Sequence, residues 1–312
     1  MFNIKKDVFL NNNDVINSQD FKRTIIVVDS RFRDPGSYSP TDYMMKLMKP
    51  YKNIIRVRLT STEFPNVFYT FTQVKNNVRF KIFYDVDMGN GIQRVYYPVE
   101  IKSGNYTAEG MRTEVQGKLT LLATTIGSQY GGVQPEFNIE LDNITARYTI
   151  SDSAVGSQPF GIDFSEESLM DRRMDWGLGY YLGYRKRLYE PNTLKAFEAE
   201  SFMDTNGNPN LYMELNDYIS CELNNKENNI HCFAVLIQKE NKYFSIFGDE
   251  MSFLTREIVF QQPRDVSQFR VRLFDVYGNI VDMRDTDWTF TLELTEVMNP
   301  KLYGFYKDYN QI

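Results

Sequence analysis

The side chains best suited to catalysis are few, and they gather around the sole histidine. His231 stands beside Cys232, and Cys221 lies a short distance upstream. A Ser-His-Asp or Cys-His arrangement would have to use this histidine, and no G-x-S-x-G turn accompanies it. The three side chains match no known zinc spacing, and no fourth ligand is indicated. The pattern therefore favours a structural histidine and two buried thiols, with no catalytic residue, no metal and no cofactor.

Two other stretches imitate ligand-binding loops. Residues 177–183 are rich in glycine, but their spacing is one residue too long for a dinucleotide-binding turn, and a charged segment precedes them. Residues 204–208 resemble the opening of a calcium loop, yet Pro209 replaces the turn glycine and Leu215 replaces the bidentate glutamate. An Asx-rich turn is the better interpretation of 204–208.

Basic side chains are densest between residues 172 and 187. They are Arg172, Arg173, Arg185, Lys186 and Arg187. Such a run is usually a solvated face, here with acids nearby at Glu166, Glu167 and Asp171. The alternative is a contact with an acidic neighbour or a packaged genome. The solvated face is favoured because no wider basic excess surrounds the run.

Composition narrows the classes of protein further. The 312 residues carry a net charge of −6, which argues against a dedicated nucleic-acid binder. No run approaches 18 apolar residues, so we expect no transmembrane segment, and no signal peptide is evident. Aromatic residues make up 15% of the chain, a share typical of β-rich cores and of interfaces. The 41 acidic residues leave a glycan-binding or glycan-cleaving sandwich open.

Short strands, separated by turn residues, are predicted along most of the chain. Residues 24–30 read as a buried strand, and the turn at 87–91 indicates a hairpin. In the last strand Trp288, Phe290, Leu292 and Leu294 point one way. Helices are expected at 107–130, where Thr107 can cap an apolar stripe, and, less regularly, at 166–175.

About ten or eleven strands with an inserted helix and no βαβ alternation predict an all-β, antiparallel jelly-roll sandwich. We expect an N-terminal arm over 1–23, one jelly-roll domain over 24–298 and a tail over 299–312. Within that domain, residues 153–210 are irregular and read as an insertion.

Four segments, in order, resemble minor capsid and penton-type proteins of nucleocytoplasmic large DNA viruses. The last of them is the closing stretch 271–294, and together the four span residues 25–296, nearly the whole chain. The matching residues and contact candidates are Asp29, Ser30, Arg31, Arg33, Asp34, Tyr38, Pro40, Tyr43, Tyr51, Asn53, Ile54, Pro65, Asn66, Gly104, Asn105, Tyr106, Thr107, Leu182, Gly183, Tyr184 and Arg185. One departure is Ser39-Pro40, where the family more usually has Tyr-Pro.

The resemblance implies a jelly-roll capsid protein with no enzyme activity, located in the icosahedral shell of a virion assembled in the host cytoplasm. Its partners would be itself, with a pentamer among the expected assemblies, the major capsid protein and other minor capsid proteins. No small-molecule substrate is expected. For the segment 29–34, two readings weigh equally: a capped turn that holds the first strand, or arginines that pair with Asp34 or with acids of a neighbour. A glycan-active sandwich and a host-attachment fibre remain as alternative functions.

Overall fold

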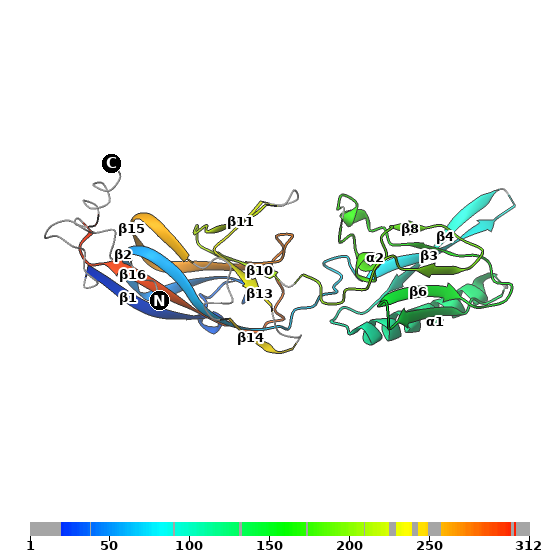
Figure 1. Cartoon of the computed structure of the whole chain (residues 1–312), viewed down its shortest axis with the longest axis horizontal. Coiled ribbons are helices and arrows are strands. Elements are labelled where there is room, and N and C mark those ends of the chain that lie inside the picture. The colour runs from blue at the N-terminus through cyan, green and yellow to red at the C-terminus, as the bar shows by residue number, and fades with distance from the viewer. Residues whose placement is uncertain are drawn as a thin grey trace. The chain divides into compact units, whose positions relative to one another are not determined.

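The computed structural model describes residues 20–37, 39–89, 91–130, 133–172, 174–208, 210–224, 229–238, 243–248, 257–300 and 303. Its contacts divide the chain into two compact units (Figure 1). Unit 1 consists of residues 1–68 and 208–312, and unit 2 consists of residues 69–207. Unit 2 is therefore one continuous segment that interrupts unit 1 in the sequence.

Unit 1 is built on a seven-stranded sheet with the order β1-β16-β2-β15-β10-β13, in which β14 also pairs with β2. Its strands are β1 (Phe21–Asp29), β2 (Asp42–Pro65), β10 (Asn210–Leu215), β13 (Ala234–Ile237), β14 (Ser245–Gly248), β15 (Glu257–Phe274) and β16 (Thr289–Val297). A 3-10 turn, η3 (Ser30–Phe32), follows β1, and β11 (Cys221–Asn224) pairs with β12 (Asn229–Cys232) as a separate hairpin. The first and last strands of the unit, β1 and β16, are direct neighbours.

One apolar core collects side chains from β1, β2, β10, β13, β15 and β16. The long strands β2 and β15 pair along most of their length, and three register shifts interrupt their pairing. Such shifts bend a strand pair, and here the sheet curves around its own core as a sandwich. Residues 42–65 thus form one continuous strand, β2, and residues 257–274 form one continuous strand, β15.

Strand β1 lies at the edge of this sheet. The sequence predicted a buried strand here, but only Val28 is fully buried, while Ile25 and Val27 are 59% and 66% exposed. Alternate side chains of a strand point to opposite faces, so one face of β1 packs on the core and the other face is uncovered among the described residues. The expectation of a buried strand was therefore right for one face only.

Unit 2 contains two smaller sheets and the principal helix. The four-stranded sheet has the order β4-β3-β7-β8 and the three-stranded sheet has the order β5-β6-β9. The elements are β3 (Arg79–Asp87), β4 (Ile92–Glu100), α1 (Ala108–Tyr130), β5 (Phe137–Asp142), β6 (Arg147–Asp152), β7 (Gly161–Asp163), η4 (Glu167–Leu169), α2 (Leu178–Tyr181), β8 (Leu188–Tyr189) and β9 (Ala196–Glu198). Helix α1 packs against β5 and β4, and both sheets share one apolar core with it (Figure 1).

Helix α1 confirms the local signals in the sequence. The Thr107 hydroxyl accepts a hydrogen bond from the Gly110 backbone N–H at 3.1 Å, which caps the first turn. The apolar stripe that includes Met111, Val115 and Leu119 is fully buried in the core of unit 2. Local sequence and tertiary packing therefore agree on this helix.

Every strand pairing among the described residues is antiparallel, so the all-β antiparallel sandwich class with jelly-roll character is confirmed. Two expectations were wrong. The helix expected over 166–175 is only the short turn η4, and sixteen strands are described where ten or eleven were expected. Several of the additional strands have two to four residues, too few for a period-2 pattern to show.

The expected domain limits, 1–23, 24–298 and 299–312, stay a prediction. The contacts instead group residues 69–207, a longer stretch than the irregular segment 153–210, into a unit with its own core. Residues 1–19 and most of the tail lie outside the described residues, and β1 already begins at Phe21, inside the expected arm.

Candidate functional site

The segment Asp29–Arg33 forms a hydrogen-bonded turn at the end of β1. The Asp29 carboxylate caps η3 by accepting the Arg31 backbone N–H at 2.9 Å, and the Arg31 guanidinium binds the same carboxylate. This hydrogen-bonded ion pair holds the pKa of Asp29 below its usual value, against the opposing effect of burial. Arg31 is therefore paired within the turn and not with Asp34.

Ser30 and Arg33 tie this turn to the start of the last strand. The buried Ser30 hydroxyl donates to Asp287 Oδ1 at 2.7 Å and accepts the Trp288 backbone N–H at 3.0 Å. Arg33 donates to the same Asp287 oxygen at 2.8 Å. We call Asp29, Ser30, Arg33, Asp287 and Trp288 the β1–β16 junction. Of the two equally weighted readings, the contacts within the chain support the capped turn.

Neighbouring motif residues support the same junction from the side of β2. The Asp34 carboxylate accepts the Lys46 backbone N–H at 3.2 Å, and the Asp34 N–H donates to the Met44 carbonyl at 2.8 Å. Tyr43 is fully buried in the core, and burial raises the pKa of its phenol far above the usual range. Tyr38 lies outside the described residues.

Pro65 and Asn66 mark the end of β2. Pro65 is the register partner of Ser245 in β14, and the Asn66 backbone exchanges two hydrogen bonds, both of 2.9 Å, with residues 243 and 244. Asn66 is buried. The motif thus fixes where β2 leaves the sheet of unit 1.

The Gly104–Thr107 motif joins the strands of unit 2 to helix α1. The Gly104 backbone exchanges hydrogen bonds with Phe71, and the Asn105 side chain accepts the Thr70 N–H at 2.8 Å. The ring of Tyr106 packs edge-on against the ring of Phe71, with 5.7 Å between centroids. This motif therefore positions the helix whose first turn Thr107 caps.

The Leu182–Arg185 motif is also internal to unit 2. Leu182 and Tyr184 are fully buried, and the Tyr184 hydroxyl donates to the Phe197 carbonyl at 3.0 Å. Gly183 has a φ of +91°, and a Cβ added there would lie 2.2 Å from the Ser201 carbonyl oxygen. The Arg185 guanidinium lies over the ring of Tyr180 at 4.8 Å. Only glycine fits position 183 without displacing the neighbouring backbone.

The structure brings the two motifs of unit 2 together through one ring. Phe71 lies between Tyr106 and Tyr181, the residue just before Leu182, with 5.7 Å and 5.2 Å between ring centroids. The motif residues of unit 1 form their own contacts at the β1–β16 junction and at the end of β2. The motifs of unit 2 therefore meet at Phe71, whereas those of unit 1 fix separate turns.

The basic segment 172–187 is largely engaged within the chain. Arg172 lies 4.0 Å from Asp175 and Lys186 lies 3.9 Å from Glu200, so both side chains pair with acids of the same unit. The Arg187 guanidinium donates to the Leu169 carbonyl at 3.1 Å. Arg173 lies outside the described residues. These contacts agree with the reading of a structural surface.

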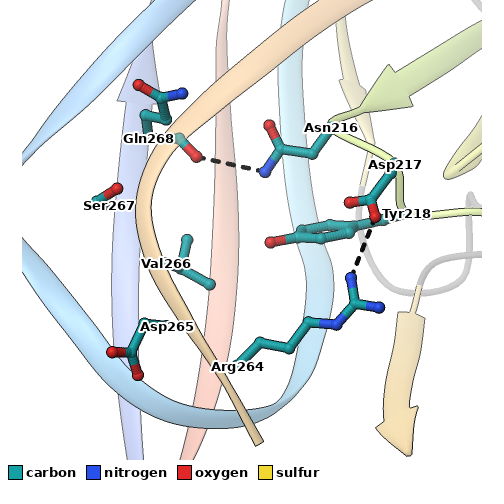
Figure 2. Close-up of a pocket in the computed structure, with 8 residues that line it drawn as sticks. All are labelled: Asn216, Asp217, Tyr218, Arg264, Asp265, Val266, Ser267 and Gln268. Carbon is teal, nitrogen blue, oxygen red and sulfur yellow. Dashed lines mark hydrogen bonds and ion pairs between the residues drawn. The ribbon is translucent and has the colours of Figure 1, made fainter. Parts of the chain in front are cut away.

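Sequence reasoning missed a polar cleft in unit 1, shown in Figure 2. The cleft encloses about 230 Å³ between residues 216–218, which follow β10, and residues 264–268 of β15. Arg264 and Asp217 form an ion pair of 3.1 Å across it, and Asp265 accepts the Asn53 backbone N–H at 3.1 Å. The cleft coincides with the register shifts of β15, a long-range feature that no local motif indicates.

The charged side chains of this cleft pair with each other and are open to water. The Arg264 and Asp217 side chains are 53% and 73% exposed, so water competes for both. The Asn216 amide is held at both ends, accepting the Arg270 N–H at 2.7 Å and donating to the Gln268 carbonyl at 3.3 Å. The cleft is therefore a rigid polar notch where β15 changes register.

The remaining candidates for chemistry are dispersed. In the part of the chain that the structure describes, no three His, Cys, Asp or Glu side chains gather as a metal site, and no helix is long and apolar enough to cross a membrane. Asp204 accepts the backbone N–H of Asn206 at 2.9 Å, which is the predicted Asx turn. Trp176 and Trp288 are both buried, so neither ring is available to stack on a sugar.

Exposed aromatic side chains occur in loops of both units. They are Phe32, Phe202, Tyr243 and Phe244, each more than 60% exposed. Exposed apolar side chains that are scattered singly are normal on a folded protein, so these rings alone do not indicate an interface. No single motif in the sequence distinguishes these rings from the many aromatics of the core.

Comparison with known proteins gives limited information. No family model matches the chain, and no curated protein matches it. A similar solved structure is that of the mavirus penton protein, with 12% sequence identity, coverage of 88% of this chain and 98% of that chain, and a TM-score of 0.45. This degree of similarity assigns neither a family nor a function to the chain.

Proposed function

We propose that the chain is a structural component of an icosahedral virus shell, either a penton at the five-fold vertex or a minor capsid protein that joins major capsid proteins. It would act by binding fixed neighbours and would carry out no reaction. The partners are further copies of itself, the major capsid protein and other minor capsid proteins. The proposal draws first on the four segments that resemble minor capsid and penton-type proteins and that occur in the family's order.

The observation that carries the proposal is the structural role of the motif residues in these segments. Each one fixes a turn or a strand end: Ser30 joins β1 to β16, Pro65 ends β2, Asn105 places α1, and Gly183 permits a tight backbone approach. The resemblance therefore concerns the residues that determine the framework of a rigid antiparallel sandwich. A rigid framework presents its loops at fixed positions, which suits contacts repeated by symmetry.

The contacts themselves are assigned to the N-terminal arm and to exposed rings in the loops. Ile25 and Val27 leave an apolar strip on the edge strand β1, and Phe32, which is 74% exposed, follows it directly. An exposed apolar edge strand is prone to pair with another chain unless something covers it. The arm runs directly into this strip, so both belong to one contact region.

Removal of residues 1–19 tests this assignment and leaves β1 intact, because β1 begins at Phe21. We expect the truncated chain to keep its circular dichroism spectrum and melting temperature but to enter particles poorly when produced with the major capsid protein. The matched variant Phe32→Ala keeps the arm and removes only an exposed ring, and it should weaken incorporation less. Normal incorporation of the truncated chain would remove the arm from the proposal.

The alternative functions predict different results. A glycan-binding sandwich should retain sugars on a glycan array, whereas a shell protein should retain none strongly. A host-attachment fibre should be accessible to antibodies on the outside of intact particles. Both measurements use the full chain.

A further inference from the structure

The hairpin β11–β12 places the two cysteines of the chain directly opposite each other. Cys221 and Cys232 are register partners, and both are free thiols. Directly opposed side chains of an antiparallel pair share one face, with Cβ atoms about 4.5–5.5 Å apart. A disulfide requires a Cβ separation of about 3.5–4.5 Å. A small adjustment of the hairpin therefore brings the two sulfurs to bonding distance.

The two thiols differ in access. Cys232 is fully buried and packs with Tyr212, Ile230 and Val235, while Cys221 is partly exposed. Burial, together with the charge and the hydrogen bond of the neighbouring Cys221 thiol, raises the pKa of Cys232 to about 12. The thiolate is the reactive form of cysteine, and Cys221 is the more exposed of the two thiols. An external reagent therefore reacts first with Cys221, and Cys232 then attacks the resulting mixed disulfide.

We propose that Cys221 and Cys232 are a modification site, at which a small disulfide such as oxidised glutathione closes a cross-strand disulfide. The Cys221 thiolate attacks one glutathione sulfur, so that a Cys221–glutathione bond forms, the glutathione S–S bond breaks and one glutathione thiolate leaves. Cys232 then attacks Cys221 Sγ, and its proton passes to the second glutathione thiolate as this group leaves. In total two cysteine thiols are oxidised and one glutathione disulfide is reduced to two thiols.

The bond would link the two strands of a hairpin that pairs with no other sheet among the described residues. Two paired strands alone are marginally stable in water, so the covalent link would add to the contacts of Cys232 with Tyr212 and Val235 in holding the hairpin. A reducing cytoplasm keeps such thiols free, and an oxidising medium closes them. This inference rests on the register of the hairpin and is independent of the proposed shell function.

The experiment treats the reduced full-length protein with oxidised glutathione, blocks the remaining thiols by alkylation and records the intact mass. The expected product has lost two hydrogens, carries no glutathione, takes up no alkylating reagent and contains a linked 221–232 peptide pair. Cys232→Ser should stop with one glutathione on Cys221. The matched double variant Cys232→Ser/His231→Cys moves the second thiol to the other face of the hairpin and should also stop at the mixed disulfide.

A second comparison does not depend on the folding of any variant. The ratio of closed to mixed disulfide in the wild-type chain should be at least about tenfold higher in buffer than in concentrated urea, because the folded hairpin holds the thiols together. Equal ratios in the two solvents would overturn the proposal. So would a folded wild-type chain that keeps glutathione on Cys221 as persistently as Cys232→Ser does, or that forms linked dimers instead.

Discussion

The motif residues of the β1–β16 junction hold the chain through individual hydrogen bonds. Ser30 and Asp287 are 257 positions apart, yet their side chains meet at 2.7 Å and share their contact with Arg33 and the Trp288 backbone. A buried hydroxyl with both a donor and an acceptor partner stabilises one arrangement of the chain, because any other arrangement leaves polar groups unpaired. The serine of the Asp-Ser-Arg motif is therefore a junction residue and not a nucleophile.

Replacing Ser30 by alanine should lower the free energy of unfolding by about 1–3 kcal/mol, because the half-buried Asp287 carboxylate and the buried Trp288 backbone N–H each lose a partner. Urea titration followed by circular dichroism measures the change. Arg31→Ala is the matched control from the same turn, since the Arg31 side chain is 65% exposed, and its midpoint should stay close to that of the wild type. Equal effects of the two substitutions would contradict the role given to Ser30.

At the scale of elements, the sequence predicted the features that depend only on residues close together in the chain. The Thr107 cap, the apolar stripe of α1 and the alternation of Trp288, Phe290 and Leu292 all appear as expected. Each of these depends on residues only a few positions apart, so the pattern and its cause lie in the same window. Helix α1 and strand β16 could therefore be predicted from the sequence.

The features that the sequence did not reveal depend on partners far along the chain. Ile25 and Val27 look like core residues until β1 is known to occupy a sheet edge, which the strand order alone decides. The polar cleft lies where β15 shifts register against β2, and Asp217 approaches it from the turn after β10. The motif residues were found, but their roles as turn and junction residues became clear only from their hydrogen bonds.

Alanine substitutions at two glycines of unit 2 should change the stability of the protein in opposite directions. Gly183→Ala should destabilise the protein by about 2 kcal/mol or more, because a left-handed φ and a Cβ contact of 2.2 Å with the Ser201 carbonyl both oppose it. Gly117→Ala, on an open face of α1 with no atom within 4 Å of the added Cβ, should instead stabilise by about 0.5–1 kcal/mol. Thermal denaturation of both variants checks the pair. A neutral Gly183→Ala would show that this turn is less constrained than its geometry indicates.

At the scale of the whole molecule, the chain is two units that each have a core. The first core is formed by strands from both ends of the sequence, and the second by residues 71–199 alone. The chain enters and leaves unit 2 side by side, since the Thr70 hydroxyl donates to the Asn206 carbonyl at 3.3 Å. Adjacent ends and a separate core are the marks of an inserted folding unit.

Residues 69–207 expressed alone should therefore fold. We expect a cooperative thermal transition and a well-dispersed amide spectrum, because the segment keeps every side chain of its own core. The complementary chain, in which a short glycine-serine linker replaces 69–207, should also fold, since Thr70 and Asn206 show that the junction spans a small distance. A segment 69–207 that stays unfolded would show that its core depends on unit 1.

The central claim is that this chain occupies a fixed place in an icosahedral shell. An electron cryomicroscopy reconstruction of purified particles that contain the chain tests it most directly. We predict ordered density for both units at symmetry-related positions in the shell, at the five-fold vertex or against the major capsid protein, with the apolar strip of β1 covered by a neighbour. Particles whose shell is complete without density for the chain would contradict the claim.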